Sequence, residues 1–280
     1  MPFLELFDET LDINSTENYE ISVELSYYSI SFCILDTIRN KFIMLRSLHP
    51  DDNHKYTIEE IDEIIIKDDF LTKKYKRVNI IVPSSKFTLI PAPLFDPAKK
   101  DEYFLFNHVS SEGNVILNNK LTDPDSFLVF ALSPSVNNLV KNRWPGTHPF
   151  HHLKPLLDDV CKSGRNTSEN YIHIHVEQDF FNLIFYNHNI LRFCNSFNYR
   201  NISDILYYVL NVFKSMDIKQ EETVYLSGQA ERYDDLYSNL VMYIRNVKFA
   251  EPSGNFTFSY VFNDAGLHKS INLISAVNCV

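Results

Sequence analysis

The stretch ISVELSYYSISFCILD, residues 21–36, reads as two β-strands joined by a tight reversal. Residues 21–25 and 30–36 are rich in β-branched and aromatic side chains, which favour strands. The reversal between them is SYYS, residues 26–29. A third strand of the same kind is predicted over residues 42–48, so we expect an antiparallel meander near the start of the chain.

A helix and a buried strand are predicted after this meander. Thr57 is expected to cap the helix, because Glu60 lies three residues on and completes a capping box. The apolar run at 78–82 predicts the buried strand. The second half repeats this order, with strands expected over 171–176, 181–186 and 190–197, a helix capped near Ser203, a strand over 223–228, a helix over 230–246 and a short strand near 250. Two copies, offset by roughly 150 residues, indicate a duplicated unit.

Three antiparallel strands extended by a parallel crossover form the ribonuclease-H-like topology. We therefore expect an α/β protein with two tandem domains of this kind, each a mixed five-stranded sheet flanked by helices. The first is predicted over residues 1–168, with an inserted or irregular segment around 84–130. The second is predicted over 169–280, and the two are expected to face each other across a cleft.

Composition narrows the class of function. A net charge of -10 disfavours a nucleic-acid groove, whose phosphate contacts need clustered Lys and Arg. The four cysteines lack a CxxC spacing, which fits a reducing cytosol. The start has no signal-peptide pattern, and no apolar run is long enough to span a membrane. We expect a cytoplasmic protein without nucleic acid or membrane insertion, as a monomer or weak homo-oligomer.

Glycine is scarce. Average usage of about 7% would give roughly 20 glycines in a chain of this length. The sequence has 6, and they are well separated. It therefore contains neither a Walker loop nor a Rossmann GxGxxG motif, two common phosphate-binding signatures.

Two ribonuclease-H-like units in tandem are the hallmark of the actin-like ATPase superfamily, which this chain resembles over residues 20–270. It resembles more narrowly an uncharacterised Bacteroidetes family, domain of unknown function 3822. The resemblance implies a two-lobed actin-like fold, and the family implies no established activity. The plan is also similar to the actin-like assembly proteins of type IV pili and type II secretion, which act in protein complexes.

The nucleotide motifs of the superfamily are degenerate in this sequence. Its first phosphate motif has an Asp and then a Gly, and the matching positions hold Glu24 and Ser26. In the second phosphate motif, the Asp has become His175 and the Gly has become Glu177. The adenosine motif has two glycines, of which Gly228 remains. These five residues are predicted to be vestigial cleft positions.

Physical chemistry indicates what these changes do. Glycine lets backbone N–H groups converge on a phosphate, whereas Tyr27 would occupy that space. A charged Glu177 about 4 Å from a phosphate charge would cost about 4 kcal/mol at an effective dielectric near 20. Magnesium would lack its second carboxylate. We therefore assign no catalytic, cofactor-binding or metal-ligating residue, and we expect no cofactor, with Mg-ATP disfavoured.

The sequence supports a nuclease site or a zinc site less well. A nuclease needs about three converging carboxylates, and beside Glu24 only the helix residues Glu59, Glu60 or Glu63 are candidates. His173 and His175 share one strand face, and His148, His151 and His152 could form a second cluster, but no zinc motif fixes either group.

The function expected from the sequence is that of a non-catalytic actin-like scaffold or adaptor in a cytoplasmic complex, with a protein partner that the residues do not identify. The alternative is a noncanonical nucleotide-binding protein or ATPase that uses the interdomain cleft, with Glu24 and the Gly228 turn. Whether it is an enzyme stays open, with the motifs leaning against one.

Overall fold

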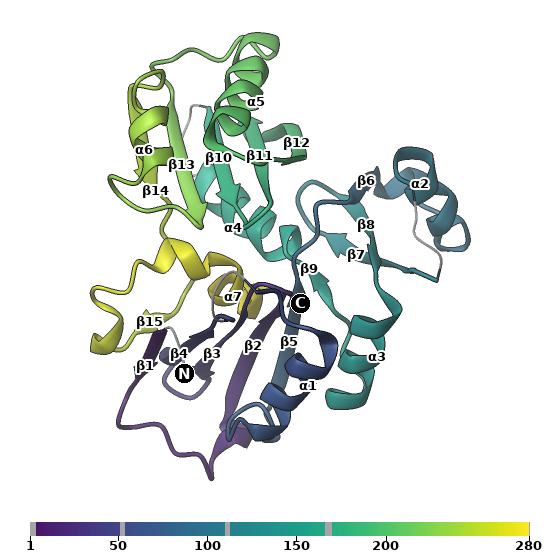
Figure 1. The fold of residues 1–280 in the computed structure, drawn as a ribbon, viewed down its shortest axis with the longest axis vertical. Helices are drawn as coiled ribbons and strands as arrows, with labels where there is room; N and C mark the ends of the chain where they lie inside the picture. The colour runs from purple at the N-terminus through teal and green to yellow at the C-terminus, as the bar shows by residue number, and fades with distance from the viewer. Residues whose placement is uncertain (1–3, 51–53, 110–112, 166–169, 280) are drawn as a thin grey trace. The chain divides into compact units, whose positions relative to one another are not determined.

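The computed structural model describes residues 4–50, 54–109, 113–165 and 170–279. It divides into two compact units. The first is Met1–Leu156 with Gly254–Ala265 and Asn272–Val280. The second is Leu157–Ser253 with Gly266–Ile271. Each unit contains one copy of the repeated strand and helix order (Figure 1).

The main sheet of the first unit has the order β1-β4-β3-β2-β5-β9, and β15 also pairs with β4. Strands β2, β3 and β4 form the predicted antiparallel meander, and β5 pairs with β2 in parallel. The sheet has seven strands, because the chain ends add β1 and β15 beside the repeated set. The elements are β1 (Leu4–Phe7), β2 (Tyr19–Leu25), β3 (Ile30–Asp36), β4 (Lys41–Leu48), α1 (Ile58–Lys67), β5 (Arg77–Val82), α3 (Pro134–Arg143), β9 (Phe150–His151) and β15 (Thr257–Phe258).

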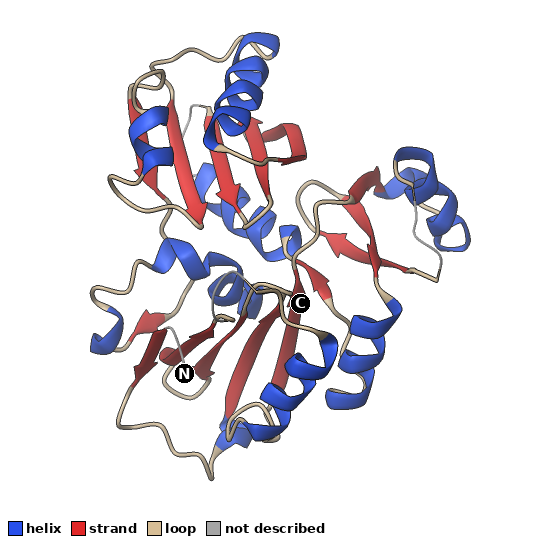
Figure 2. Ribbon diagram, in the orientation of Figure 1, coloured by secondary structure: helices blue, strands red, loops and turns tan. Residues whose placement is uncertain are grey.

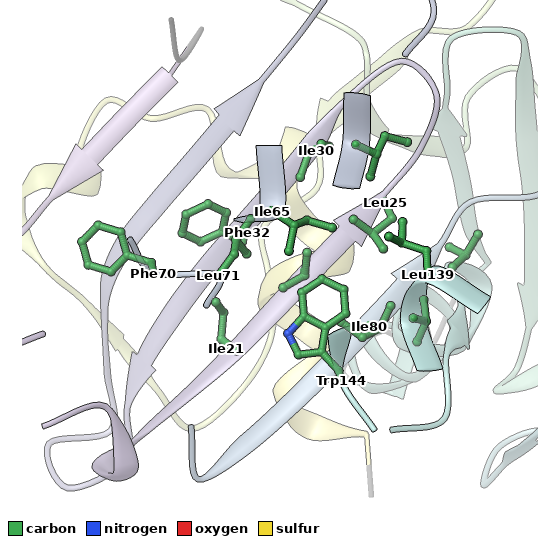
Figure 3. Packing of buried hydrophobic residues seen from close by; sticks show 14 of the residues in the cluster. Ile21, Leu25, Ile30, Phe32, Ile65, Phe70, Leu71, Ile80, Leu139 and Trp144 are labelled. Carbon is green, nitrogen blue, oxygen red and sulfur yellow. The ribbon is translucent and has the colours of Figure 1, made fainter. Parts of the chain in front are cut away.

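Helices α1 and α3 close one face of this sheet over an apolar core (Figures 2 and 3). Thr57 and Glu60 form the predicted capping box at the start of α1. The apolar positions of α1 face the strands, with Ile65 packed near Phe32. Trp144, directly after α3, lies in the same core. Burial of one such side chain contributes about 1.5–3 kcal/mol, so this cluster fixes the meander.

The segment predicted to be irregular forms a small sheet of its own, with the order β6-β8-β7. Phe104 of α2 packs on this sheet, in one buried cluster with Val129 of β8. The elements are β6 (Phe87–Pro91), α2 (Lys100–Asn107), β7 (Val115–Leu121) and β8 (Ser126–Leu132).

The second unit has a five-stranded sheet with the order β12-β11-β10-β13-β14. Strands β10, β11 and β12 are antiparallel, whereas β13 pairs with β10 in parallel, which repeats the plan of the first unit. Helices α5 and α6 contribute to the core on one face. The elements are α4 (Leu153–Arg165), which begins in the first unit, β10 (Tyr171–Val176), β11 (Phe180–Asn187), β12 (Ile190–Asn198), α5 (Ile202–Ser215), β13 (Thr223–Gly228), α6 (Asp235–Leu240) and β14 (Asn246–Phe249).

Two helix predictions in this unit are wrong in detail. Asn201, and not Ser203, caps α5, because its side chain accepts the N–H of Asp204 in a capping box. Helix α6 is shorter than predicted: Asp234 caps it and Tyr233 takes a left-handed φ of 71° just before it. Such a backbone angle cannot continue a helix.

The end of the chain returns to the first unit. Arg77 of β5 donates to the carbonyl of Cys279 (3.3 Å), beyond α7 (Ile271–Ser275). No local sequence pattern predicts this return. None of the described helices is both long and apolar enough to cross a membrane. Short 3₁₀ turns are η1 (Thr16–Asn18), η2 (Ala92–Leu94), η3 (Pro97–Lys99), η4 (Tyr260–Phe262), η5 (Leu267–Ser270) and η6 (Ala276–Asn278).

Candidate functional site

The turn at residues 26–29 lies where the first phosphate motif would bind an anion. Ser26 Oγ accepts hydrogen bonds from the N–H groups of Tyr28 (3.1 Å) and Ser29 (2.9 Å). The N–H of Ser26 donates to the carbonyl of Ser29 (3.0 Å). A phosphate cradle needs such N–H groups to point at the ligand. Here the Ser26 side chain accepts two of the turn's N–H groups, and the carbonyl of Ser29 accepts a third.

Glu24 ends β2 just before this turn. Its Oε2 accepts from the side-chain amide of Asn272 (3.3 Å), and both residues belong to the first unit. The carboxylate is half-buried. A magnesium ion would need this carboxylate and a second one nearby, whereas the chain itself already gives Glu24 an amide partner.

Gly228 is retained for a reason that lies in the fold. It ends β13 with a φ of +79°, a conformation that favours glycine. A Cβ atom at this position would lie 2.1 Å from the carbonyl oxygen of Val176 on β10. The same carbonyl accepts the N–H of Gln229 (2.7 Å). Close pairing of two strand ends is therefore enough to explain this glycine.

The second phosphate position is filled by a buried chain of polar side chains in the second unit. Nδ1 of His175 lies 2.7 Å from Ser227 Oγ, and Nε2 of His173 lies 2.7 Å from the same oxygen. Nε2 of His175 lies 3.1 Å from Oε1 of Glu177. The parallel register of β10 and β13 produces this arrangement, because it pairs His175 with Ser227.

Burial sets the protonation of this chain. It lowers the pKa of His173 and of His175 to about 3, with the neighbouring His175 adding to the shift of His173. It raises the pKa of Glu177 to about 8, with a smaller contribution from the charge of Asp179. These shifts favour an uncharged Glu177 carboxyl beside an uncharged His175 ring. The sequence argument assumed a charged Glu177, whereas burial raises the pKa of this carboxyl and favours its neutral form, and its Oε1 lies 3.1 Å from Nε2 of His175.

The connected side chains of His173, Ser227, His175 and Glu177 fit neither a catalytic nucleophile nor a metal centre. The side chain of Ser227 is fully buried, so a substrate cannot reach its Oγ. In the part of the chain that the structure describes, no three His, Cys, Asp or Glu side chains are arranged to hold a metal. Nδ1 of His173 is buried without a hydrogen-bond partner among the described residues. The arrangement supports a structural role for these groups.

The carboxylates considered for a nuclease and the histidines of the second cluster do not form sites either. Glu60 accepts the N–H of its capping partner Thr57, and Glu63 pairs with Lys67 (2.9 Å), so both belong to the exposed surface of α1. His151 and His152 are buried side by side with ring centres 4.5 Å apart, whereas His148 is exposed. The nuclease and second histidine clusters are therefore not assembled.

Two residues at these positions escaped the sequence reasoning. Ser227 is a small polar residue inside an apolar strand, directly before the retained Gly228, and this interruption was a usable signal. Asn272 lies in a short helix far along the chain, and no local pattern connects it with Glu24. Ser227 is a hydrogen-bond partner of His175, and Asn272 is one of Glu24.

Comparisons with known proteins agree with this fold. The model of a family described as a protein of unknown function, DUF3822, matches residues 8–247. No curated protein matched the sequence. A crystal structure from Bacteroides thetaiotaomicron VPI-5482, described as a protein with an actin-like ATPase fold and unknown function, is 23% identical. It matches over 92% of this chain and 98% of that one, with a TM-score of 0.75.

A second similar structure is the PilM-PilN type IV pilus biogenesis complex. It is 10% identical, covers 93% of this chain and 98% of that one, and has a TM-score of 0.55. At such low identities both likenesses show the fold alone. Because the family match spans most of the sequence and the strand order is repeated in both units, the chain belongs to the DUF3822 family of proteins of unknown function and has the actin-like ATPase fold.

Proposed function

We propose that the protein is a non-catalytic actin-like scaffold or adaptor in a cytoplasmic complex, with a degenerate nucleotide site. One observation carries the proposal: Ser26 Oγ accepts the N–H groups of Tyr28 and Ser29 in the turn where a phosphate would bind. Releasing these N–H groups for an anion would leave the serine hydroxyl to find new partners. A site that is satisfied internally gains little from a ligand.

The other vestigial positions support the same function. The Asp of the second phosphate motif is replaced by His175, whose two ring nitrogens are occupied by Ser227 and Glu177. Glu24 accepts from Asn272. Hydrolysis of ATP needs metal-held phosphates and an oriented water, and neither position offers a carboxylate that is ready for magnesium.

The similar fold of PilM supports the scaffold role. That protein is described in a complex with PilN for type IV pilus biogenesis. A fold of this kind can therefore serve within a protein assembly, and fold alone never fixes a function. We infer a protein partner for this chain as well.

Thermal unfolding with and without millimolar Mg-ATP tests the proposal. A ligand at 100 times its dissociation constant would stabilise the folded protein by about 2.7 kcal/mol, which gives an easily measured rise in Tm. We expect no rise. The same measurement on Glu24→Gln, with Glu63→Gln on the exposed face of α1 as the matched control, identifies the site of any effect.

A reproducible rise in Tm with Mg-ATP that Glu24→Gln abolishes and Glu63→Gln preserves would establish the nucleotide-binding alternative. A Gly228 variant is unsuited to this test, because any Cβ there meets the Val176 carbonyl and disturbs the fold itself.

A further inference from the structure

Strand β12 is a long sheet edge. Among the described residues it pairs with β11 and with no other strand, and it lies at the edge of the second unit's sheet (Figure 1). It is nine residues long, whereas β14 at the opposite edge has four. Natural proteins protect such edges with short strands, prolines or several charges. β12 has no proline, and Arg192 is its single charged residue.

An aromatic shelf lies beside this edge. Phe193 and Phe197 of β12 are half-buried against the core of the second unit. Phe197 stacks on Tyr208 of α5 with ring centres 4.7 Å apart, and Tyr208 meets Tyr207 edge-on at 5.4 Å. Tyr207 is 66% exposed. Aromatic residues that are half-buried in this way are enriched at protein interfaces.

Strand β12 itself carries no negative charge, although Asp179 and Asp204 lie near its C-terminal end, where Asp204 Oδ2 accepts the N–H of Arg200 (2.8 Å). Residues 180–203 contain no Asp or Glu, although the chain carries 36 of these residues and a net charge of -10. The same stretch contains Arg192 and Arg200, both exposed. Pairing of two copies through β12 would bring the positive charge of Arg192 in one copy toward that of the other, so charge favours an acidic partner over a second copy.

We propose that the β12 edge and its aromatic shelf bind an extended segment of a partner protein in which apolar side chains alternate with acidic ones. Such a segment adds a strand to the sheet: its main chain pairs with β12, and alternate side chains face the shelf. The acidic side chains of the segment pair with Arg192 and Arg200. The inference rests on the proposed adaptor role and gives it a surface.

A capped nine-residue peptide in which valine or phenylalanine alternates with glutamate serves as the probe, after sedimentation has shown it to be monomeric. Amide hydrogen exchange reports where it binds. We expect exchange in residues 190–198 to slow at least tenfold, and the glutamate peptide to bind at least tenfold more tightly than its lysine counterpart. Arg192→Glu should reverse this preference, whereas Arg232→Glu, at another exposed position of the second unit, should leave it unchanged.

Three results would overturn the proposal: no protection of residues 190–198 at millimolar peptide, protection confined to another element, or equal affinity for the two peptides. Concentration-dependent dimerisation that protects β12 without peptide would assign the edge to a second copy. If the peptide does not bind and Mg-ATP has no effect on Tm, the β12 proposal fails and the adaptor role stands. If Mg-ATP raises Tm, the adaptor role is overturned, whatever the result with the peptide.

Discussion

Replacement of Gly228 by alanine tests whether this glycine is retained for the fold. Gly228 has a φ of +79°, and an added Cβ would lie 2.1 Å from the carbonyl oxygen of Val176. Real Cβ atoms do not approach a backbone oxygen so closely. Because that oxygen belongs to β10 and cannot rotate away, the ends of β10 and β13 must separate.

The cost has two parts. A left-handed φ in a residue with a Cβ costs roughly 1–2 kcal/mol. Separation of the strand ends also weakens the Gln229 N–H bond to Val176 (2.7 Å) and strains the backbone, which adds about 2–3 kcal/mol. We therefore expect Gly228→Ala to reduce the free energy of unfolding by about 3–5 kcal/mol, among the largest effects of single substitutions.

Gly146→Ala is the matched control. Gly146 also has a left-handed φ, +85°, but a Cβ there would meet nothing within 4 Å. Urea unfolding of both variants should give a loss at Gly228 that exceeds the loss at Gly146 by about 2 kcal/mol or more. Hydrogen exchange of the β10 amides assigns the loss to the second unit. Equal losses in the two variants would refute the close-contact argument and restore a nucleotide-related reason for Gly228.

Two further substitutions test the internal partners. Ser26→Ala leaves the N–H groups of Tyr28 and Ser29 without their acceptor, so urea unfolding should show a loss of about 1–2 kcal/mol; an equal loss in the control Ser203→Ala, at an exposed position of α5, would contradict this. Because burial raises the pKa of Glu177 from 4.5 to about 8, its contribution to stability is complete below pH 4.5 and is lost as the pH rises through 8. The stability of the wild type relative to Glu177→Gln should therefore fall over this window by up to about 1.4 kcal/mol per pH unit, and a constant difference between pH 5 and 8 would contradict the assigned protonation.

The repeated architecture could be predicted from the sequence because its signals are local. Apolar runs such as 78–82 and the capping box at Thr57 each depend on a few neighbouring residues, and the structure confirms them as β5 and the start of α1. Because the same order of strands and helices occurs twice, the prediction for each half strengthened the prediction for the other. The return of the C-terminal segment to the first unit could not be predicted, because its contacts, such as Arg77 with the Cys279 carbonyl, join residues about 200 positions apart.

The candidate site was predictable in its positions and not in its chemistry. The changes at Glu24, His175 and Glu177 could be read directly from the sequence. The raised pKa of Glu177 follows from its burial, which only the folded chain shows. A charge argument made from residue types alone therefore leaves out the effect of burial on the carboxyl group of Glu177.

One physical rule applies to the two turns that the sequence assigns to the phosphate motifs. A phosphate loop holds its backbone N–H groups and carboxylates ready for a ligand, and without that ligand these polar groups must find other partners or remain costly. In this chain Ser26 accepts the N–H groups of the first turn, and Ser227 connects His173 and His175 beside the second. Loss of the nucleotide would thus remove the selection for glycine and favour side chains that satisfy the loop from within, while the strand pairing that Gly228 permits is kept because the fold itself depends on it.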